Sequence, residues 1–156
     1  KHSEIKVYKK IKLHNHIYVG IMPIDDKNIF VKLHVENSEF HNDILDTFKV
    51  FCDSFSYNEN KIDFSIPEYW NNKLDNDAFS KYKYDLKSIH GSKILSISEI
   101  PIVNQKNDID FISANVNRWR RQLGLNTISE TQVELLLENR SSELGKYKFI
   151  EIENEK

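Results

Sequence analysis

The chain has 156 residues, of which 39% are hydrophobic and 29% charged, and its formal net charge is −2. This length suits one globular domain with a sizeable core, or a fragment of a larger protein. Aromatic residues make up 12% of the chain, which argues against disorder. No run approaches the roughly 18 apolar residues of a membrane span, and we recognise no signal peptide. The single cysteine, Cys52, excludes a disulfide framework and a cysteine-based zinc site.

The first third of the chain predicts three strands followed by a helix. Apolar residues alternate with polar ones over residues 5–13, 16–22 and 29–36, which is typical of strands in an antiparallel meander. A turn is expected at Asp25-Asp26-Lys27-Asn28. Large apolar residues then recur every three or four positions over residues 39–55, and this spacing predicts an amphipathic helix that packs on the meander, with Asn37 or Ser38 as its N-cap.

The middle of the chain is more polar. Residues 56–61 form a weak internal boundary within an otherwise single domain over residues 1–156. A hairpin is expected over residues 80–88 and 93–99, with Tyr82 and Tyr84 opposite Leu95 and Ile97.

Two helices and a strand follow. The spacing of apolar residues predicts a helix over residues 109–123, and Gly124 stands where a left-handed residue ends it in a Schellman motif. Ser129-Glu130-Thr131-Gln132 is a capping box that opens a second helix, whose Val133, Leu136 and Leu137 are expected to face inward. Residues 147–152 form a last strand. The fold class is therefore α+β, an antiparallel sheet of about six or more strands with helices on its faces.

One helical segment departs from the rest of the composition. Only four residues of the chain are arginine, and three of them are Arg118, Arg120 and Arg121. The guanidinium fork suits carboxylate and phosphate groups in a way that lysine does not. The candidate binding residues on this helix are the polar side chains that flank its apolar stripe: Asn115, Asn117, Arg118, Arg120, Arg121 and Gln122.

Two interpretations of this cluster stay open. The side chains contact an anion or the carboxylate of a peptide, or else one or two arginines hold a carboxylate or carbonyl inside the fold while the asparagines bond loop backbone. Basic residues around an aromatic ring are also typical of nucleic-acid binding. Against that third interpretation, Trp119 belongs to the apolar stripe, the chain is net acidic and no broad basic patch surrounds the cluster.

Other candidates for chemistry are few. His14, His16 and His34 lie on neighbouring predicted strands, but no complete set of zinc ligands is assured, so we expect exposed strand histidines and no metal; a metal site at these three residues is the weaker alternative. Cys52 lies beside the apolar stripe of its helix and is expected to be a small core residue. Since we find no nucleophile, phosphate-binding or dinucleotide motif, neither a cofactor nor an enzymatic activity is expected.

The segment Ala114 to Leu125, with Ile128-Ser129-Glu130 after it, resembles the A-N-V-N-R-W-R-x-Q-L-G-L signature of a family of uncharacterised bacterial proteins, often exported or lipid-anchored, with a PsbP-like fold. Weaker matches are residues 29–33 and 48–54, which resemble the W-F-F-K-L strand and F-x-x-F-x-x-S helix of that family, and residues 66–70, which resemble its V-P-E-G-W segment. The resemblance implies that Trp119 and Gly124 are part of a structural signature.

The chain departs from that family in two respects. The family usually has glycine where this chain has Arg121. Its strand and helix follow the signature, whereas residues 29–33 and 48–54 precede it here. Three arrangements would explain this order: a domain whose segments are rotated in sequence, a chain that spans parts of two tandem copies of the domain, or a domain with swapped segments.

The residues and the resemblance together lead to one expected function and two alternatives. We expect a non-enzymatic, PsbP-like binding or scaffold module that contacts a protein partner through the helix at residues 115–122. The resemblance implies an exported location, periplasmic or lipid-anchored, and a cytoplasmic one stays open. The first alternative is a small-ligand carrier or enzyme with a pocket between the sheet and the Trp119 helix, as the clustered arginines and Tyr82 and Tyr84 indicate. The second is nucleic-acid binding through residues 118–121.

Overall fold

The computed structural model describes residues 14–38, 42–59, 61–67, 70, 72–73, 82–85, 92–101 and 108–155. The strand predicted over residues 5–13 lies outside this part of the chain. Asn37 and Ser38 are the last residues of a strand, and the described part of the helix begins at Asn42. The segment between them lies outside the described residues, so the N-cap of this helix stays a prediction.

The described residues form a seven-stranded sheet in which every neighbouring pair is antiparallel. In chain order its strands are β1 (His14–Ile24), β2 (Lys27–Ser38), β5 (Asn72–Lys73), β6 (Tyr82–Asp85), β7 (Ser92–Pro101), β8 (Glu138–Ser142) and β9 (Gly145–Glu155). Across the sheet the order is β5-β6-β7-β2-β1-β9-β8. The last strand, β9, thus pairs with β1, the first described strand. Strands β2 and β7 also pair, although the polar segment at residues 56–61 lies between them in the sequence.

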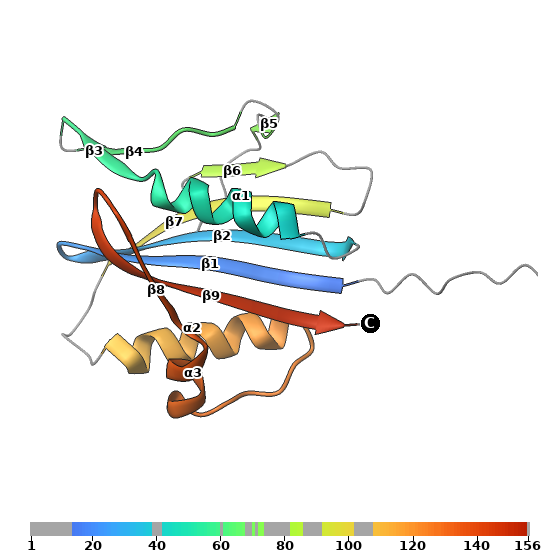
Figure 1. The fold of residues 1–156 in the computed structure, drawn as a ribbon. Helices are drawn as coiled ribbons and strands as arrows, with labels where there is room; N and C mark the ends of the chain where they lie inside the picture. The colour runs from blue at the N-terminus through green and yellow to red at the C-terminus, as the bar shows by residue number, and fades with distance from the viewer. Residues whose placement is uncertain are drawn as a thin grey trace, which may run out of the picture.

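Helices cover both faces of the sheet, so the fold has three layers and is α+β (Figure 1). Helix α1 (Asn42–Asp53) lies on one face, and α2 (Asp108–Gln122) and α3 (Glu130–Leu136) lie on the other. Because the central strand β1 lies between the two helical layers, its residues from Asn15 to Met22 are all buried. The predicted strand over residues 16–22 is confirmed.

The α1 layer is built on aromatic side chains. Phe48, Phe51 and Phe55 are buried at helical spacing, and Phe51 meets Trp70 edge to face at 5.8 Å between ring centroids. A glycine on β1 brings the helix close to the sheet. A Cβ atom at Gly20 would lie 3.2 Å from Sγ of Cys52, closer than packed atoms ordinarily approach.

The α2 layer is built around Trp119, which is 1% exposed. The indole ring meets Phe30 of β2 edge to face, with 5.3 Å between ring centroids. Such pairs add to the free energy gained by burying both rings. Val116 and Leu123 complete the buried stripe that the apolar spacing of residues 109–123 predicts.

The junction between α2 and α3 matches the predicted motifs. The backbone N–H of Gly124 donates to Arg121 and that of Leu125 donates to Arg120, the two hydrogen bonds of a Schellman motif, and Gly124 has φ of 75°. Ser129 and Gln132 form the capping box. Val133 is buried, but Leu136 is 48% exposed, so the expectation that Leu136 faces inward is wrong. Helix α3 ends at Leu136, one residue before the chain turns into β8.

Polar segments contain strands that periodicity does not reveal. Strands β3 (Ser56–Asn58) and β4 (Lys61–Asp63) form a separate two-stranded ribbon where the sequence indicates only a weak internal boundary. Strand β8 has the sequence Glu-Asn-Arg-Ser-Ser and lies at the edge of the sheet. The predicted hairpin of residues 80–88 and 93–99 is present as β6 and β7, with Tyr82 opposite Ile97 and Tyr84 opposite Leu95.

Candidate functional site

The asparagines of the arginine-rich helix bind backbone within the fold. The side chain of Asn117 donates to the carbonyl oxygen of Ile128 at 3.0 Å and accepts from the backbone N–H of the same residue at 2.8 Å. Asn115 donates to the carbonyl oxygen of Phe111, one turn earlier on α2. Both side chains therefore have a structural role in α2 and in the loop that follows it.

Arg118 and Arg120 make side-chain hydrogen bonds within the fold, and Arg118 is exposed all the same. Nε of Arg120 donates to the carbonyl oxygen of Asn126 at 2.7 Å. Arg118 donates to Oδ1 of Asn115 at 3.1 Å, and its guanidinium lies 5.8 Å from the centroid of the Trp119 ring. Arg121 is exposed, and we find no side-chain partner for it among the described residues. Of the three arginines, Arg120 thus stabilises the loop between α2 and α3 through its hydrogen bond to Asn126.

A lysine from the sheet joins the cluster. Nζ of Lys32 on β2 donates to Oε1 of Gln122 at 2.9 Å. Burial, and then the positive charge of Arg118, lowers the pKa of Lys32 to about 8. The charges of Lys32 and Arg118 therefore act on each other at the C-terminal half of α2.

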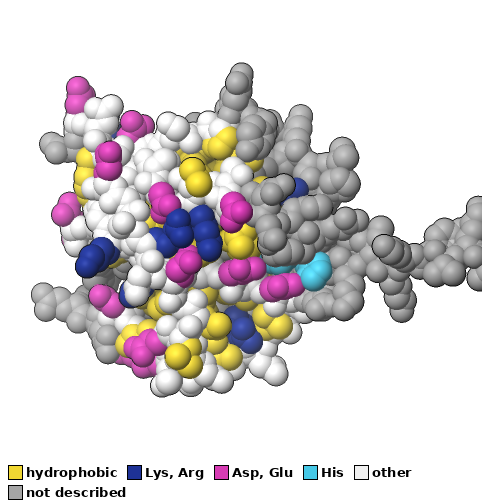
Figure 2. All heavy atoms as spheres, viewed as in Figure 1, with side chains coloured by type: hydrophobic (Ala, Val, Ile, Leu, Met, Phe, Trp, Pro, Cys, Tyr) yellow, Lys and Arg dark blue, Asp and Glu magenta, His cyan; other side chains and the backbone are white. Residues whose placement is uncertain are grey.

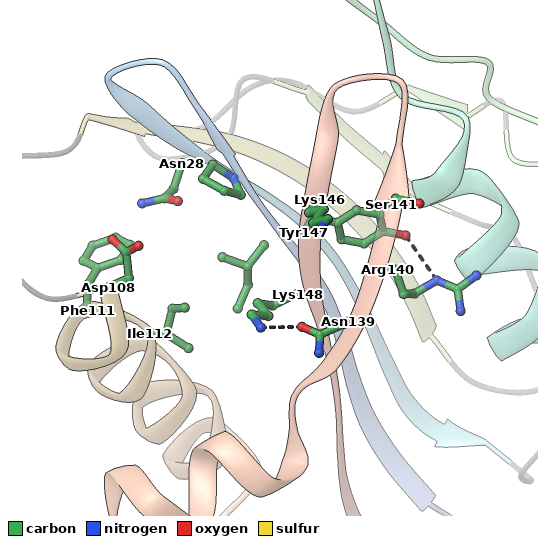
Figure 3. A pocket seen from close by; sticks show the side chains of 12 residues that line it. Asn28, Asp108, Phe111, Ile112, Asn139, Arg140, Ser141, Lys146, Tyr147 and Lys148 are labelled. Carbon is green, nitrogen blue, oxygen red and sulfur yellow. Dashed lines mark hydrogen bonds between the residues drawn. The ribbon is translucent and has the colours of Figure 1, made fainter.

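A cleft among the described residues lies at the opposite end of α2 (Figure 3). It has a volume of about 700 Å³, in the range of small-molecule sites. Its lining residues come from the N-terminal half of α2, the β1–β2 hairpin and the β8–β9 hairpin: Ile21, Pro23, Asn28, Asp108, Phe111, Ile112, Asn139, Arg140, Ser141, Lys146, Tyr147 and Lys148. A second hollow of about 430 Å³ shares Asp108, Ile112, Asn139 and Lys148 with it and extends toward α3.

The cleft combines an apolar floor with a basic rim. Ile21, Phe111 and Ile112 supply the floor. Lys146 and Lys148, two residues apart on β9, point to the same face of the sheet, because side chains alternate along a strand. Lys148 donates to Oδ1 of Asn139 across the β8–β9 hairpin (Figure 3).

Arg140 also borders the cleft but is held on the other side of β8. Its guanidinium binds both carboxylate oxygens of Asp53 at the end of α1, at 2.5 and 3.2 Å. The hydroxyl of Tyr147 donates to Oδ1 of Asp53 at 2.5 Å. Burial raises the pKa of the Asp53 carboxyl, but the hydrogen bonds from Arg140 and Tyr147 outweigh it and leave this pKa below its ordinary value. Asp53 therefore links the end of α1 to both strands of the β8–β9 hairpin.

The structure separates the three candidate histidines. His14 and His16 point to the α1 face of β1 and stack with 5.5 Å between ring centroids. His34 is the Cα partner of Ile17, which is buried in the α2 layer, so His34 points to the opposite face. The third side chain beside His14 and His16 is Glu153 of β9.

Tyr82 and Tyr84 pack against the α1 layer and not against α2. The cleft beside α2 is therefore not lined by these tyrosines, although the carrier alternative was based partly on them. A more polar hollow of about 460 Å³ is lined by Tyr82, by the β3–β4 ribbon and by the first residues of β2. Cys52 is fully buried, and burial raises the pKa of its thiol, in agreement with the prediction of a core residue.

Sequence analysis did not identify the residues that line the cleft, because they come from three separated segments of the chain. The one available signal was the alternation of Lys146, Tyr147 and Lys148, which puts two cations on one face of the last strand. Figure 2 shows basic, acidic and hydrophobic side chains interspersed on the face of the molecule turned to the viewer.

Comparisons with known proteins add no relative. No protein-family model, curated protein or solved structure matches the chain. The resemblance to the PsbP-like family therefore stays a prediction. Among the described residues, no helix has both the length and the apolar character needed to cross a membrane.

Proposed function

We propose that the protein is a non-enzymatic binding module whose ligand is a small molecule with an apolar body and one anionic group. The observation that carries this proposal is the cleft of about 700 Å³ between α2 and the β8–β9 hairpin. Apolar ligand surface would be buried on Ile21, Phe111 and Ile112, and burial of this kind supplies most of the affinity in small-molecule sites.

The charge at the rim selects the class of ligand. Lys146 and Lys148 lie on the α2 face of β9, whereas the guanidinium of Arg140 is occupied by Asp53. Asp108 is the one carboxylate among the described residues that line the cleft. Two lysines against one carboxylate favour an anionic head group, such as a carboxylate, sulfonate or phosphate, over a cationic one.

The test compares two fluorescent probes that differ in one group. Anilinonaphthalene sulfonate has an apolar body and an anion, and phenylnaphthylamine has nearly the same body without the anion. We expect saturable binding of both probes, tighter for the sulfonate. The double substitution Lys146→Gln/Lys148→Gln should weaken the sulfonate by about tenfold per lost contact, or about 1.4 kcal/mol, and leave the neutral probe unchanged.

Two further variants locate the site. Asn139→Trp places a large ring in the cleft from the exposed strand β8 and should abolish binding of both probes. Arg121→Gln removes an exposed cation at the far end of α2 and should change neither affinity. Sulfonate binding that survives Asn139→Trp, or that falls equally in Arg121→Gln, would overturn the proposal.

A second candidate is contact with an acidic segment of a protein partner through the other end of α2. The charges of Lys32 and Arg118 act on each other there, and their repulsion contributes to the lowered pKa of Lys32. A carboxylate of a partner would relieve this repulsion. Binding of an aspartate-rich peptide that is lost in Arg118→Gln/Arg121→Gln, but kept in Lys146→Gln/Lys148→Gln, would support this candidate. Loss in both double variants would point instead to non-specific attraction by net charge.

A further inference from the structure

A group of potential metal ligands lies on the α1 face of the sheet, away from the cleft. One nitrogen from each of His14 and His16 and one carboxylate oxygen of Glu153 all lie within 4.8 Å of one another. We propose that these three side chains bind one divalent transition-metal ion, with Zn²⁺ as the physiological candidate. This site is independent of the proposed ligand cleft.

The pairing of two hydrogen-bonded strands brings the three side chains together. His14 and His16 are two residues apart on β1 and therefore share a face. His16 and Glu153 are direct Cα partners in the antiparallel pairing of β1 with β9, so their side chains lie side by side on that face. Ligands held by paired strands are better positioned than ligands on loops, which reduces the entropy lost when the ion binds.

The donor set fits zinc better than magnesium or calcium. Two imidazole nitrogens and one carboxylate oxygen, with a further position for water, form a typical open zinc site, whereas Mg²⁺ and Ca²⁺ prefer oxygen ligands throughout. Zinc bonds of about 2.0–2.1 Å place tetrahedral donors about 3.3 Å apart. The three donor atoms lie within 4.8 Å of one another, so the side chains have to draw closer together to reach this spacing.

The surroundings favour a cation and allow it to enter. Oε1 of Glu151, the next residue on this face of β9, lies 4.0 Å from Nδ1 of His16 and adds a second carboxylate. The His16 side chain is 1% exposed, whereas those of His14 and Glu153 are 15% and 38% exposed. An ion would thus approach past His14 and Glu153 and meet His16 at the base of the site. Figure 2 shows a histidine side chain at the surface beside acidic ones.

The experiment uses the full chain at about pH 7.5, where histidine is mostly neutral. Co²⁺ replaces zinc as a visible probe, and calorimetry with Zn²⁺ gives the affinity and stoichiometry. We expect one ion per chain, cobalt absorption bands typical of four or five ligands, displacement of cobalt by zinc, and no comparable binding of Mg²⁺. Zinc should also raise the thermal unfolding midpoint, because it binds only the folded arrangement.

Conservative variants connect the ion to these residues. His14→Gln and Glu153→Gln change partly exposed side chains and should each lower zinc affinity by at least about tenfold, since even the loss of a residue that only orients a ligand has an effect of this size. The matched control His34→Gln removes a histidine from the opposite face and should keep full affinity. Circular dichroism of each variant checks that the fold is retained.

Four results would overturn the proposal, and three of them come from the natural chain and the control variant. These are the absence of saturable zinc binding, equal binding of zinc and magnesium, and an affinity loss in His34→Gln as large as that in His14→Gln. If the Gln variants are folded and still bind zinc at full affinity with one ion per chain, the ion lies elsewhere in the protein and this site is excluded.

Discussion

The side-chain amide of Asn117 binds Ile128 twice, accepting a hydrogen bond from its N–H and donating one to its carbonyl oxygen. Ile128 precedes the N-cap of α3. One side chain of α2 therefore determines where the next helix begins. Arg120 adds a contact to the carbonyl oxygen of Asn126 in the same loop. This arrangement gives the Asn-Arg-Trp-Arg segment a role in the fold itself.

Asn117→Ala should destabilise the junction of α2 and α3. The substitution leaves a partly buried N–H and carbonyl of Ile128 without their partner, and a loss of this kind costs about 1–3 kcal/mol. Denaturant unfolding followed by circular dichroism measures the loss. Hydrogen exchange at the amide of Ile128 should accelerate more than exchange in β1. Equal acceleration in both segments would contradict a local role for Asn117.

Trp119→Ala should lower the free energy of unfolding by about 3–5 kcal/mol, as expected when a buried aromatic ring is removed from a core. The ring is 1% exposed and packs against Phe30. The control is Arg121→Ala on the exposed side of the same helix, with an expected change within about 0.5 kcal/mol. Urea unfolding of both variants makes the comparison. An unchanged midpoint for Trp119→Ala would mean that the ring contributes little to the core.

Lys32 should make stability depend on pH in the alkaline range. Its pKa is lowered from 10.5 to about 8 in the folded protein, so between these values the unfolded chain binds more protons. Lys32 therefore destabilises the fold below pH 8, by at most on the order of 3 kcal/mol, and this cost disappears as the pH rises toward 10.5.

Lys32→Met removes this cost at every pH. The difference in unfolding free energy between the variant and the natural chain should therefore shrink as the pH rises from 8 toward 10.5. Chemical denaturation in a series of buffers measures it, and the difference cancels the contributions of other titrating groups. Lys146→Met, an exposed lysine on β9, should show no such trend. A difference that does not vary with pH would contradict the lowered pKa.

Asp53 should make stability depend on pH in the acid range. Its pKa is below the ordinary value in the folded protein, so its ionised form stabilises the fold above that ordinary value, near 3.8. The stabilisation is lost as the pH falls through the folded pKa. The natural chain should therefore lose more stability than Asp53→Asn during acidification. The matched control, Asp46→Asn, changes an exposed carboxylate on the same helix and should follow the natural chain.

The elements with strong periodicity or a defined cap were predictable. Helix α2 has its apolar stripe, Gly124 ends it in a Schellman motif, and Ser129 with Gln132 opens α3. These signals are local, because each depends on residues within a few positions of one another. The pairing of β6 with β7 was likewise predictable from the alternation on both sides of a short loop.

The features that were missed depend on long-range pairing or on weak patterns. Strand β8 is short and polar, and it is a strand because β9 pairs with it at the sheet edge. Glu153 joins His14 and His16 only through the register of β1 with β9, across more than a hundred residues of chain. The cleft has the same origin, since α2 and the strands β1, β2, β8 and β9 supply its walls. No local pattern contains this information.

The close contact between Gly20 and Cys52 provides a natural reporter of partial unfolding. Cys52 is the single thiol of the chain and is sealed between α1 and β1, and its raised pKa further suppresses the reactive thiolate. A thiol reagent in solution can therefore react only after α1 has separated from the sheet. The labelling rate under native conditions would measure how often that layer opens, without the introduction of any probe.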